Sequence, residues 1–237
     1  MIFLRTFITA IFMMAVFSCE AKVTAQSWLV ADGDGRIIQS ENTKEVRSIA
    51  SITKLMTAMV VLDAKQNLDE RIGEYTRKEL IQLSLVHSDN QAAKTLCNYY
   101  PDGFNKCVTA MNRKSYLLGL NQTKFTDATG LSVFNVSTAE ELVTLVREAQ
   151  NYPLIVESSK MSQVKIKVKK KWFIFNNTNP IIGKRHDFIV SKTGYIRAAG
   201  GCIVMMLDTD VGRRIVVVLG SKSTKTRIPE AEFLAKI

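Results

Sequence analysis

Histidine is scarce in this sequence, with only His87 and His186 in 237 residues. Since histidine is a principal ligand of zinc and related metals, two of them leave little room for a histidine-rich metal centre. The chain also lacks internal repeats, low-complexity tracts and an interdomain linker. Its 46% apolar and 23% charged residues are close to the globular average. This composition excludes a disordered, collagen-like or heptad-repeat protein and indicates one folded domain with a sizeable core.

Long apolar runs are missing too, apart from residues 7–17, which excludes a protein with several membrane spans. That run is too short to span a bilayer comfortably, which takes about 20 residues. A basic residue precedes it and small residues follow, so we interpret residues 1–25 as a secretory signal peptide cut ahead of Gln26. Alternatively, Val16-Phe17-Ser18-Cys19 is a lipoprotein signal with Cys19 acylated, a pattern that Phe17 fits poorly. We therefore expect an exported protein of the periplasm or extracytoplasmic envelope.

Acidic residues are outnumbered 22 to 32 by lysine and arginine, which gives a net charge of +10. In the basic stretch at residues 163–171, lysines alternate with β-branched residues, as on the solvated face of an edge strand. A nucleic-acid footprint would add stacking aromatics or arginines in an ordered pattern, so we expect no nucleic-acid partner. A basic exported protein is better suited to an anionic cell wall or membrane surface. Peripheral association with a membrane is left open and is not required.

Cysteine is also infrequent, and two of the four cysteines flank a predicted turn. Cys97 and Cys107 lie on either side of Pro101 and Asp102-Gly103, which have turn chemistry. In an oxidising compartment a disulfide between them would join two helix ends, and the alternative is two buried free thiols. Cys202 lies in an apolar run and is interpreted as a core residue of a strand.

The order of the predicted elements indicates an α+β fold with an antiparallel sheet and helices beside it. Asp32-Gly33-Asp34-Gly35 predicts a hairpin between strands at residues 28–31 and 36–40. Apolar spacing predicts helices at residues 51–63, 77–86, 90–98, 104–118, 139–150 and 227–237. Ser137 and Glu140 have the spacing of a capping box before the fifth of these helices. After Pro153 the pattern becomes one of strands, at residues 163–171, 189–190, 201–207 and 214–219.

The first candidate catalytic group is Ser51-Ile52-Thr53-Lys54. Residues three apart share one face of a helix, so Ser51 and Lys54 should be neighbours. A serine hydroxyl is a weak nucleophile unless a base removes its proton, and a desolvated lysine can be that base. Serine and lysine are common residues, however, and Ser51 or Thr53 could simply cap the helix. Alone, this motif is weak evidence of catalysis.

Two further motifs strengthen the interpretation. Ser88-Asp89-Asn90 lies between two predicted helices, where a short polar loop can direct a hydroxyl and an amide into a cleft. Lys192-Thr193-Gly194 is predicted to open a strand, and it offers a cation, a hydroxyl for a carboxylate and a glycine that allows close backbone approach. Each motif by itself is a frequent cap or turn. All three in this order form a strong signal.

Ser-x-x-Lys, Ser-x-Asn and Lys-Thr-Gly in this order resemble the penicillin-recognising serine acyltransferases, which include β-lactamases and penicillin-binding proteins. From Gln26 to the C-terminus, the chain is similar to the low-molecular-mass D-alanyl-D-alanine peptidases of family S11. The segments at residues 125–132, 135–139 and 198–200 resemble the DD-endopeptidase branch, which often has Glu where this chain has Asp89. The resemblance implies a β-lactamase/DD-peptidase-like fold, an antiparallel sheet flanked by helices with a mostly helical lobe. It makes residues 26–237 one serine DD-peptidase domain.

The resemblance also implies the roles of individual residues. Ser51 would attack a D-alanyl carbonyl of a peptidoglycan stem peptide, with Lys54 as general base and Ser88 as proton relay. Asn90 would hold the substrate amide. Lys192, Thr193 and Gly194 would bind the terminal carboxylate, or the equivalent group of a β-lactam that acts as a covalent inhibitor. Backbone N–H groups of Ser51 and Tyr195 would form the oxyanion hole. No metal or organic cofactor is implied.

The family contains both carboxypeptidases and endopeptidases. Related carboxypeptidases often carry an extra C-terminal β-domain, and residues 195–237 suffice only for two strands and a closing helix. We therefore expect no extra β-domain and favour a DD-endopeptidase that cleaves cross-links. A serine β-lactamase would need a dedicated glutamate for deacylation. Glu140, Glu141 and Glu148 lie in a predicted helix, and Glu157 lacks the expected flanking asparagine. The other alternative is a non-catalytic relative that binds the wall or senses β-lactams.

Overall fold

The computed structural model describes residues 23–184 and 187–237. The predicted cleavage site, ahead of Gln26, therefore lies within the described residues. Cys19 and the predicted signal peptide up to residue 22 lie outside the described residues, as does His186. Among the described residues, no helix is long and apolar enough to cross a membrane.

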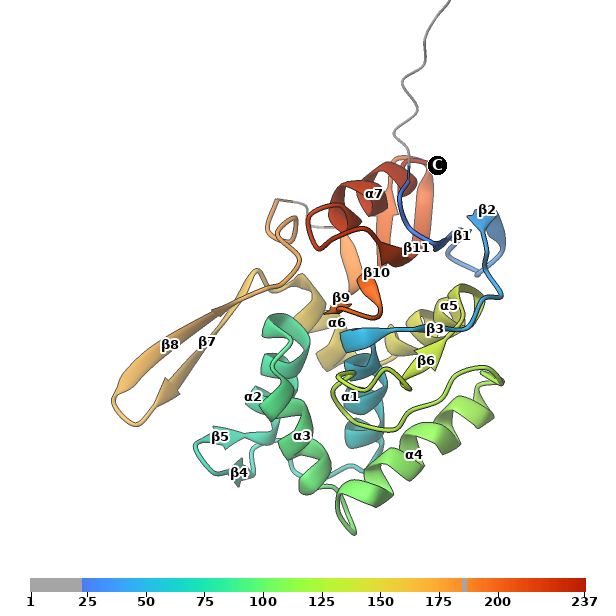
Figure 1. Ribbon diagram of the computed structural model, residues 1–237. Helices are drawn as coiled ribbons and strands as arrows, with labels where there is room; N and C mark the ends of the chain where they lie inside the picture. The colour runs from blue at the N-terminus through green and yellow to red at the C-terminus, as the bar shows by residue number, and fades with distance from the viewer. Residues whose placement is uncertain (1–22, 185–186) are drawn as a thin grey trace, which may run out of the picture.

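The predicted antiparallel sheet is confirmed and has five strands in the order β2-β1-β11-β10-β9. The hairpin of β1 (Ser27–Asp32) and β2 (Ile37–Glu41) forms one edge. The other three strands are β9 (Phe188–Ile196), β10 (Gly200–Thr209) and β11 (Gly212–Ser221), in which every neighbouring pair is antiparallel. The chain thus contributes its first two strands and its last three to one sheet (Figure 1).

Alternate residues of the central strands face two separate cores, as the period of a strand requires. Leu29, Val217 and Val204 belong to the larger cluster, which they share with the helical lobe. Val30 and Val216 belong to the smaller cluster, together with residues of α7 (Arg227–Leu234). Because both faces are covered, the strands read as nearly continuous apolar runs.

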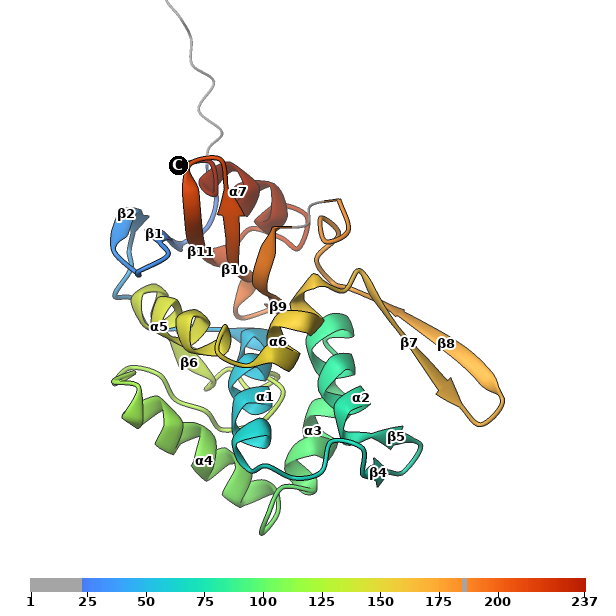
Figure 2. The same cartoon turned by 180° about the vertical axis from the view of Figure 1, so that it is seen from behind.

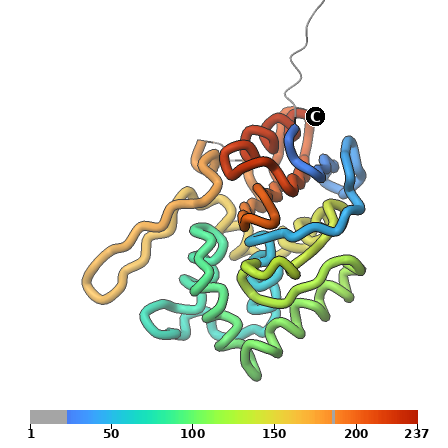
Figure 3. The backbone as a smooth tube through the Cα atoms, in the orientation of Figure 1, coloured from blue at the N-terminus to red at the C-terminus, as the bar shows by residue number. Residues whose placement is uncertain are grey.

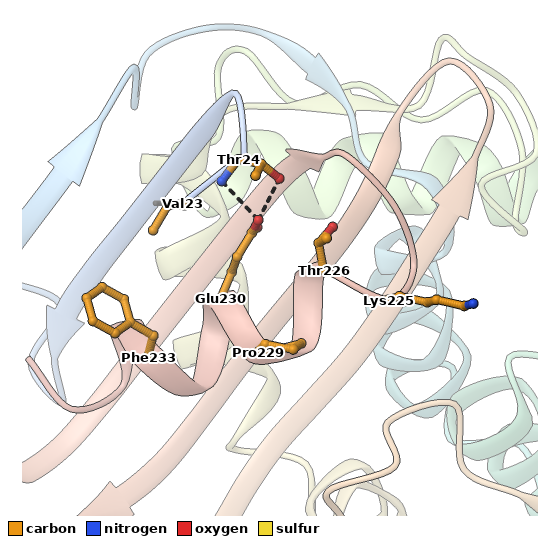
Figure 4. Close-up of a pocket in the computed structure, with 7 residues that line it drawn as sticks. All are labelled: Val23, Thr24, Lys225, Thr226, Pro229, Glu230 and Phe233. Carbon is orange, nitrogen blue, oxygen red and sulfur yellow. Dashed lines mark hydrogen bonds between the residues drawn. The ribbon is translucent and has the colours of Figure 1, made fainter. Parts of the chain in front are cut away.

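Helix α7 also fastens the start of the described chain. The backbone N–H and the hydroxyl of Thr24 both donate to Oε1 of Glu230, at 2.9 and 2.6 Å. Figure 4 shows this contact at the wall of a cavity of about 260 Å³ that Val23 and Phe233 also line. Ala25 is buried in the smaller core cluster. Residues 23–25 thus pack on the domain, on the side opposite the helical lobe.

The helical lobe is built around α1 (Thr53–Asp63), in which residues from Thr53 to Val61 are buried. A helix that is enclosed on all sides needs no polar stripe, which explains its nearly continuous apolar sequence. Around it pack α3 (Asn90–Asn98), α4 (Phe104–Leu117) and α5 (Ala139–Ala149), as Figures 1 and 2 show. Shorter elements complete the lobe: β3 (Arg47–Ser48), β4 (Arg71–Ile72), β5 (Tyr75–Thr76), α2 (Arg77–Gln82) and β6 (Val136–Ser137).

The structure contains the disulfide between Cys97 and Cys107, which was one of the two alternatives that the sequence allowed. Cys97 near the end of α3 is bonded to Cys107 in the first turn of α4, with the two Cα atoms 5.3 Å apart. Both residues are fully buried, and the chain between them contains the predicted turn. Cys202 is a buried free cysteine in β10, as predicted.

One predicted helix start and one predicted helix cap are wrong in detail. Residues 50–52 form a 3₁₀ turn, η1 (Ala50–Ile52), so α1 begins at Thr53 and not at Ser51. The cap of α5 is Thr138, whose hydroxyl accepts from the N–H of Glu141, and not Ser137. Ser137 instead lies in β6 and pairs with Arg47 of β3. These two short strands join the segment before α1 to the segment before α5.

The region after Pro153 also departs from the prediction. Instead of turning directly to strands, the chain forms α6 (Pro153–Lys160), with Pro153 in the first turn where its missing N–H costs nothing. The basic strand is β7 (Gln163–Val168), and it pairs with β8 (Lys171–Asn176) in a separate two-stranded ribbon. Its alternation is confirmed, with lysines exposed and Val164, Ile166 and Val168 buried, but it is not an edge of the main sheet.

Candidate active site

Ser51 and Lys54 lie where η1 passes into α1. Ser51 is the middle residue of the 3₁₀ turn and Lys54 is in the first turn of α1. The ammonium nitrogen of Lys54 donates to Oγ of Ser51 over 2.8 Å. The predicted pair is therefore in contact, although a 3₁₀ turn and an α-helix supply the two residues instead of one helix.

Lys54 is completely buried and makes two more hydrogen bonds. Its Nζ donates to Oδ1 of Asn90 and to the carbonyl oxygen of Thr129, each at 2.7 Å. Burial lowers the pKa of Lys54 to about 7, although the carboxylates of Asp127 and Asp89 act in the opposite direction. A lysine in this position is deprotonated in a substantial fraction of molecules near neutral pH, which a general base requires.

Ser88 and Asn90 reach the same cleft through a sharp change of direction between two helices. Ser88 has a left-handed backbone, with φ of 61°, at the end of the π-helical turn η2 (Leu83–His87). Asp89 then caps α3, since its Oδ1 accepts from the N–H of Ala92 at 2.7 Å. Asn90 is the first residue of α3. Asp89, the middle residue of this motif, thus binds a backbone N–H. Asn90 contacts Lys54, and Ser88 contacts Lys192.

Lys192 approaches Ser88 from the sheet. Its Nζ donates to Oγ of Ser88 at 2.8 Å and to its neighbour's carbonyl, that of Thr193, at 2.9 Å. Burial, with smaller effects of Lys54 and Arg227, holds the pKa of Lys192 well below its usual range. The motif lies in the second half of β9 and does not open a strand, which corrects the prediction. In β9, the Lys192-Thr193-Gly194 motif pairs with β10 on one side and faces η1 on the other.

These residues surround a cleft of about 230 Å³. Its walls are formed by Ser51, Ser88, Asn90, Leu131, Thr178, Thr193, Gly194, Tyr195 and Arg227. The two lysines lie behind this wall, buried beneath the hydroxyls to which they donate. The structure thus brings all the sequence-predicted catalytic and binding residues to one place.

Gly194 is required by the close approach of β9 to the nucleophile turn. A β-carbon on Gly194 would come within 2.9 Å of the backbone nitrogen of Ser51 and 3.0 Å of the carbonyl oxygen of Ile49. A real side chain is not tolerated at such distances without movement of the backbone. Because residue 194 has no side chain, the backbone around Tyr195 can lie beside the N–H of Ser51. Tyr195 itself lines the cleft.

Sequence reasoning assigned no role to the carbonyl of Thr129, which accepts from Lys54. The loop that carries it is organised by Asp127, whose carboxylate accepts from the N–H groups of Gly130 at 2.7 Å and Ser132 at 2.8 Å. Burial raises the pKa of Asp127, but the hydrogen bonds to its carboxylate outweigh this effect, so the pKa is lowered. The sequence Asp127-Ala128-Thr129-Gly130 has turn chemistry that could have indicated such a loop.

Arg227 and Thr178 were also missed. The guanidinium of Arg227 at the start of α7 donates from Nη1 to the carbonyl oxygen of Gly194 at 2.6 Å, while its Nε is buried without a partner. The hydroxyl of Thr178 lies 2.6 Å from that of Thr193. Both residues come from parts of the chain with no motif, so only the fold could identify them. Within residues 23–184 and 187–237, no three His, Cys, Asp or Glu side chains are grouped as metal ligands.

Solved structures of the same fold are penicillin-binding proteins and DD-peptidases. Penicillin-binding protein D2 from Listeria monocytogenes, in its cefotaxime-bound form, has a TM-score of 0.81 and 25% identity, covering 91% of this chain and 97% of that chain. The Streptomyces K15 DD-transpeptidase has a TM-score of 0.83 over the same shares at 23% identity, which supports the fold alone. The predicted β-lactamase/DD-peptidase-like fold is confirmed.

A family model described as D-alanyl-D-alanine carboxypeptidase, peptidase S11, matches residues 14–72 and 68–223. The D-alanyl-D-alanine endopeptidase of Escherichia coli is 36% identical over 93% of this chain and 79% of its own length. That of Pseudomonas aeruginosa is 35% identical over 92% and 78%. The fold and site thus define a DD-peptidase of the penicillin-binding class. The chain belongs to peptidase family S11, whose members are serine-type D-alanyl-D-alanine peptidases, which confirms the resemblance.

Proposed function

We propose that this protein cleaves D-alanyl bonds of peptidoglycan stem peptides through an acyl-enzyme on Ser51. The observation that carries the proposal is the 2.8 Å hydrogen bond between Ser51 Oγ and the buried Nζ of Lys54, whose pKa is about 7. In its neutral form Lys54 can accept the serine proton across the same contact. Few arrangements other than an activated nucleophile explain a lysine buried at such cost beside a cleft serine.

In the first step Oγ of Ser51 bonds to the D-alanyl carbonyl carbon and its proton passes to Lys54. The oxyanion accepts from the backbone N–H groups of Ser51 and Tyr195. Collapse of the tetrahedral intermediate breaks the C–N bond, and the proton on Lys54 passes through Ser88, which Lys192 contacts, to the leaving amine, so that Lys54 is neutral again. Water then attacks the ester, Lys54 removes a proton from it, and Ser51 leaves as the free hydroxyl.

Three side chains near the cleft are suited to a carboxylate. Thr193 offers a hydroxyl, Lys192 lies buried beside it, and Arg227 adds a guanidinium at the wall. A guanidinium and a hydroxyl together can hold a carboxylate by charge-assisted hydrogen bonds. We infer that they hold the terminal carboxylate of the substrate, or the carboxylate of penicillin, while the side-chain amide of Asn90 orients Lys54 and the substrate amide.

The preferred bond is that of the cross-link, so the protein is a DD-endopeptidase. The relatives at 36% and 35% identity are named D-alanyl-D-alanine endopeptidase, whereas the DacF carboxypeptidase of Bacillus subtilis is 25% identical. The proposal also includes export, with residues 1–25 removed and residues 26–237 as the peptidase domain in the periplasm or extracytoplasmic envelope. Its partner is peptidoglycan.

Penicillin would occupy the same cleft and acylate Ser51, and the adduct would be long-lived. Penicillin-binding protein D2 has been solved with cefotaxime and with ampicillin bound. A class A β-lactamase uses a dedicated glutamate to deacylate the penicilloyl ester, and the glutamates between the second and third motifs are engaged elsewhere. Glu140 and Glu141 accept from Thr43 and Thr123, Glu148 pairs with Lys114, and Glu157 pairs with Lys78.

The test is the intact mass of the protein after minutes and after hours with penicillin. A lasting adduct of one penicillin is expected in the wild type and none in Ser51→Ala. Ser115→Ala is the matched control, because Ser115 is a buried serine of α4 whose hydroxyl has no hydrogen-bond partner. An adduct that disappears as penicillin is consumed would instead indicate a β-lactamase, and no adduct would indicate an inert relative.

Cross-linked muropeptides and uncross-linked pentapeptides then distinguish the bond. We expect the wild type to cleave the cross-link faster, and Ser51→Ala to cleave neither. Faster release of terminal D-alanine from the pentapeptide would make the protein a carboxypeptidase. Failure of the intact protein to cleave either substrate would refute the enzymatic proposal.

A further inference from the structure

The ribbon of β7 and β8, residues 163–176, is strongly basic. It carries five lysines and no acidic residue, at positions 165, 167, 169, 170 and 171. All five side chains are exposed. One of them, Lys169, is 3.5 Å from a carboxylate oxygen of Glu74, on the loop between β4 and β5. Charge of this density on a single protruding hairpin is complementary to an anionic surface.

The same ribbon exposes large apolar side chains among the lysines. Trp172 is 65% exposed and Ile174 57% exposed. In the register of the ribbon Trp172 is opposite Lys167 and Ile174 is opposite Lys165, so these four side chains share one face. The Lys167 ammonium lies 5.9 Å from the centre of the Trp172 ring. The protein itself leaves this outer face of lysine, tryptophan and isoleucine uncovered.

The other face of the ribbon is packed through its β7 residues, which fixes the direction of the outer face, although Phe173 on this packed side is 45% exposed. Val164 and Ile166 are buried and belong to the larger core cluster. At its base, the ring nitrogen Nδ1 of His87 lies 3.1 Å from the carbonyl oxygen of Asn176. Figures 1 and 3 show the ribbon projecting from the helical lobe, with its turn as the outermost part. The residue before the active-site Ser88 thus contacts the base of the ribbon.

We propose that the outer face of this ribbon docks on a bilayer that contains anionic phospholipid. The lysine ammoniums contact the phosphates of the headgroups, and Trp172 and Ile174 enter the interfacial layer, where amphipathic rings and apolar side chains are favoured. A soluble polyanion would be bound by the lysines alone and would leave Trp172 and Ile174 in water. The ribbon combines both properties, which favours a bilayer. This surface is separate from the peptidase chemistry, and its test does not depend on that chemistry.

Tryptophan fluorescence gives a local test, because the chain has only two tryptophans. Trp28 is 8% exposed and Trp172 is 65% exposed, so Trp28→Phe leaves a reporter on the ribbon alone. On addition of vesicles of phosphatidylglycerol and phosphatidylcholine, the emission of Trp172 should shift to shorter wavelength, and brominated lipid should quench it. Vesicles of phosphatidylcholine alone should cause little change. The signal comes from Trp172 whatever the N-terminal residues do.

Two variants in the Trp28→Phe background separate the charge from the apolar contact. Lys165→Gln/Lys167→Gln/Lys170→Gln should weaken binding on the order of a hundredfold, at roughly fivefold per lysine. Ile174→Ser should weaken it without a change of charge. The matched control is the triple variant Lys44→Gln/Lys94→Gln/Lys106→Gln, which removes three exposed lysines elsewhere and should bind as the parent does.

Three results would overturn the proposal. The first is an emission of Trp172 that does not change with anionic vesicles. The second is equal loss of binding in the ribbon and control triple variants, which would indicate unspecific attraction to net charge. The third is unchanged binding of Ile174→Ser together with full competition by polyglutamate, which would make the ribbon a site for soluble polyanions. The far-UV circular dichroism spectrum and the Tm of every variant check that each one is folded.

Discussion

Gly130 lies so close to Ala50 that a β-carbon on Gly130 would overlap the Ala50 carbonyl oxygen. It would also come within 2.9 Å of the backbone nitrogen of Ser51. The loop that supplies the Thr129 carbonyl to Lys54 therefore packs directly on the turn that carries the nucleophile. The two halves of the site, a turn before α1 and a loop before β6, fit together only if residue 130 has no side chain.

Gly130→Ala should therefore impair acylation strongly. The new methyl group forces the Ala50–Ser51 peptide to move, and with it the N–H proposed for the oxyanion hole. Loss of one such donor costs about 10²–10³-fold in rate. The measurement is the rate constant of penicillin acylation, followed by mass.

Gly119→Ala is the control for backbone strain. Gly119 also has a positive φ, of 74°, but no atom lies within 4 Å of where its β-carbon would be. Alanine costs roughly 1–2 kcal/mol in a left-handed conformation at either position. We expect both variants to lose stability and only Gly130→Ala to lose acylation. Equal acylation rates in the two variants would contradict the role of this contact.

The pH dependence of acylation should follow Lys54. The base acts when it is neutral, and its pKa is lowered to about 7, so the rate should rise with pH through about 7 and then level off. Asp89 raises the pKa of Lys54, so Asp89→Asn should move the midpoint to lower pH. Asparagine caps a helix as well as aspartate does, which preserves α3. A midpoint that stays in place, or moves to higher pH, would argue against Lys54 as the base.

Most of the fold could be predicted because its elements have strong local signals. The helix at residues 90–98 has the predicted bounds, since Asp89 caps it and polar residues surround its apolar face. β10 and β11 are apolar runs joined by a clear turn, whereas only residues 189–190 of β9 were predicted as a strand, because the rest of β9 is mostly polar. The ribbon was harder, because β8 (Lys171–Asn176) has no alternation of polar and apolar residues. Only its pairing with β7 makes it a strand.

The site was predictable where residues close in sequence also meet in space, as Ser51 and Lys54 do. The backbone details were not, because Ala50 has φ of 47°, a value unusual for alanine that the surrounding contacts impose. Arg227 could not be identified for a different reason. It reaches the cleft only because α7 packs across the sheet from the helical lobe, with its first residue beside β9.

Arg227 should contribute to recognition of the substrate carboxylate. Arg227→Gln removes a positive charge from the cleft wall, so KM should rise for a peptide ending in D-Ala-D-Ala with a free carboxylate. The same peptide with a terminal amide should be affected much less. Arg213→Gln is the matched control, because Arg213 is exposed and pairs with Asp208 at the far end of β11. Equal losses for acid and amide would make Arg227 a support of the Gly194 carbonyl instead.

The disulfide between Cys97 and Cys107 should stabilise the helical lobe without taking part in catalysis. It closes a loop with a sequence separation of 10, for which the loss of chain entropy in the unfolded state predicts about 3 kcal/mol. Reduction should therefore lower the Tm by roughly 6–12 °C for a domain of this size. The Cys97→Ala/Cys107→Ala variant should have a low Tm that reductant does not change. Because the bridge lies at the end of α3 opposite Asn90, penicillin acylation at 25 °C should persist in the reduced protein. Loss of acylation on reduction, with the protein still folded, would show instead that α3 needs the bridge to hold Asn90 against Lys54.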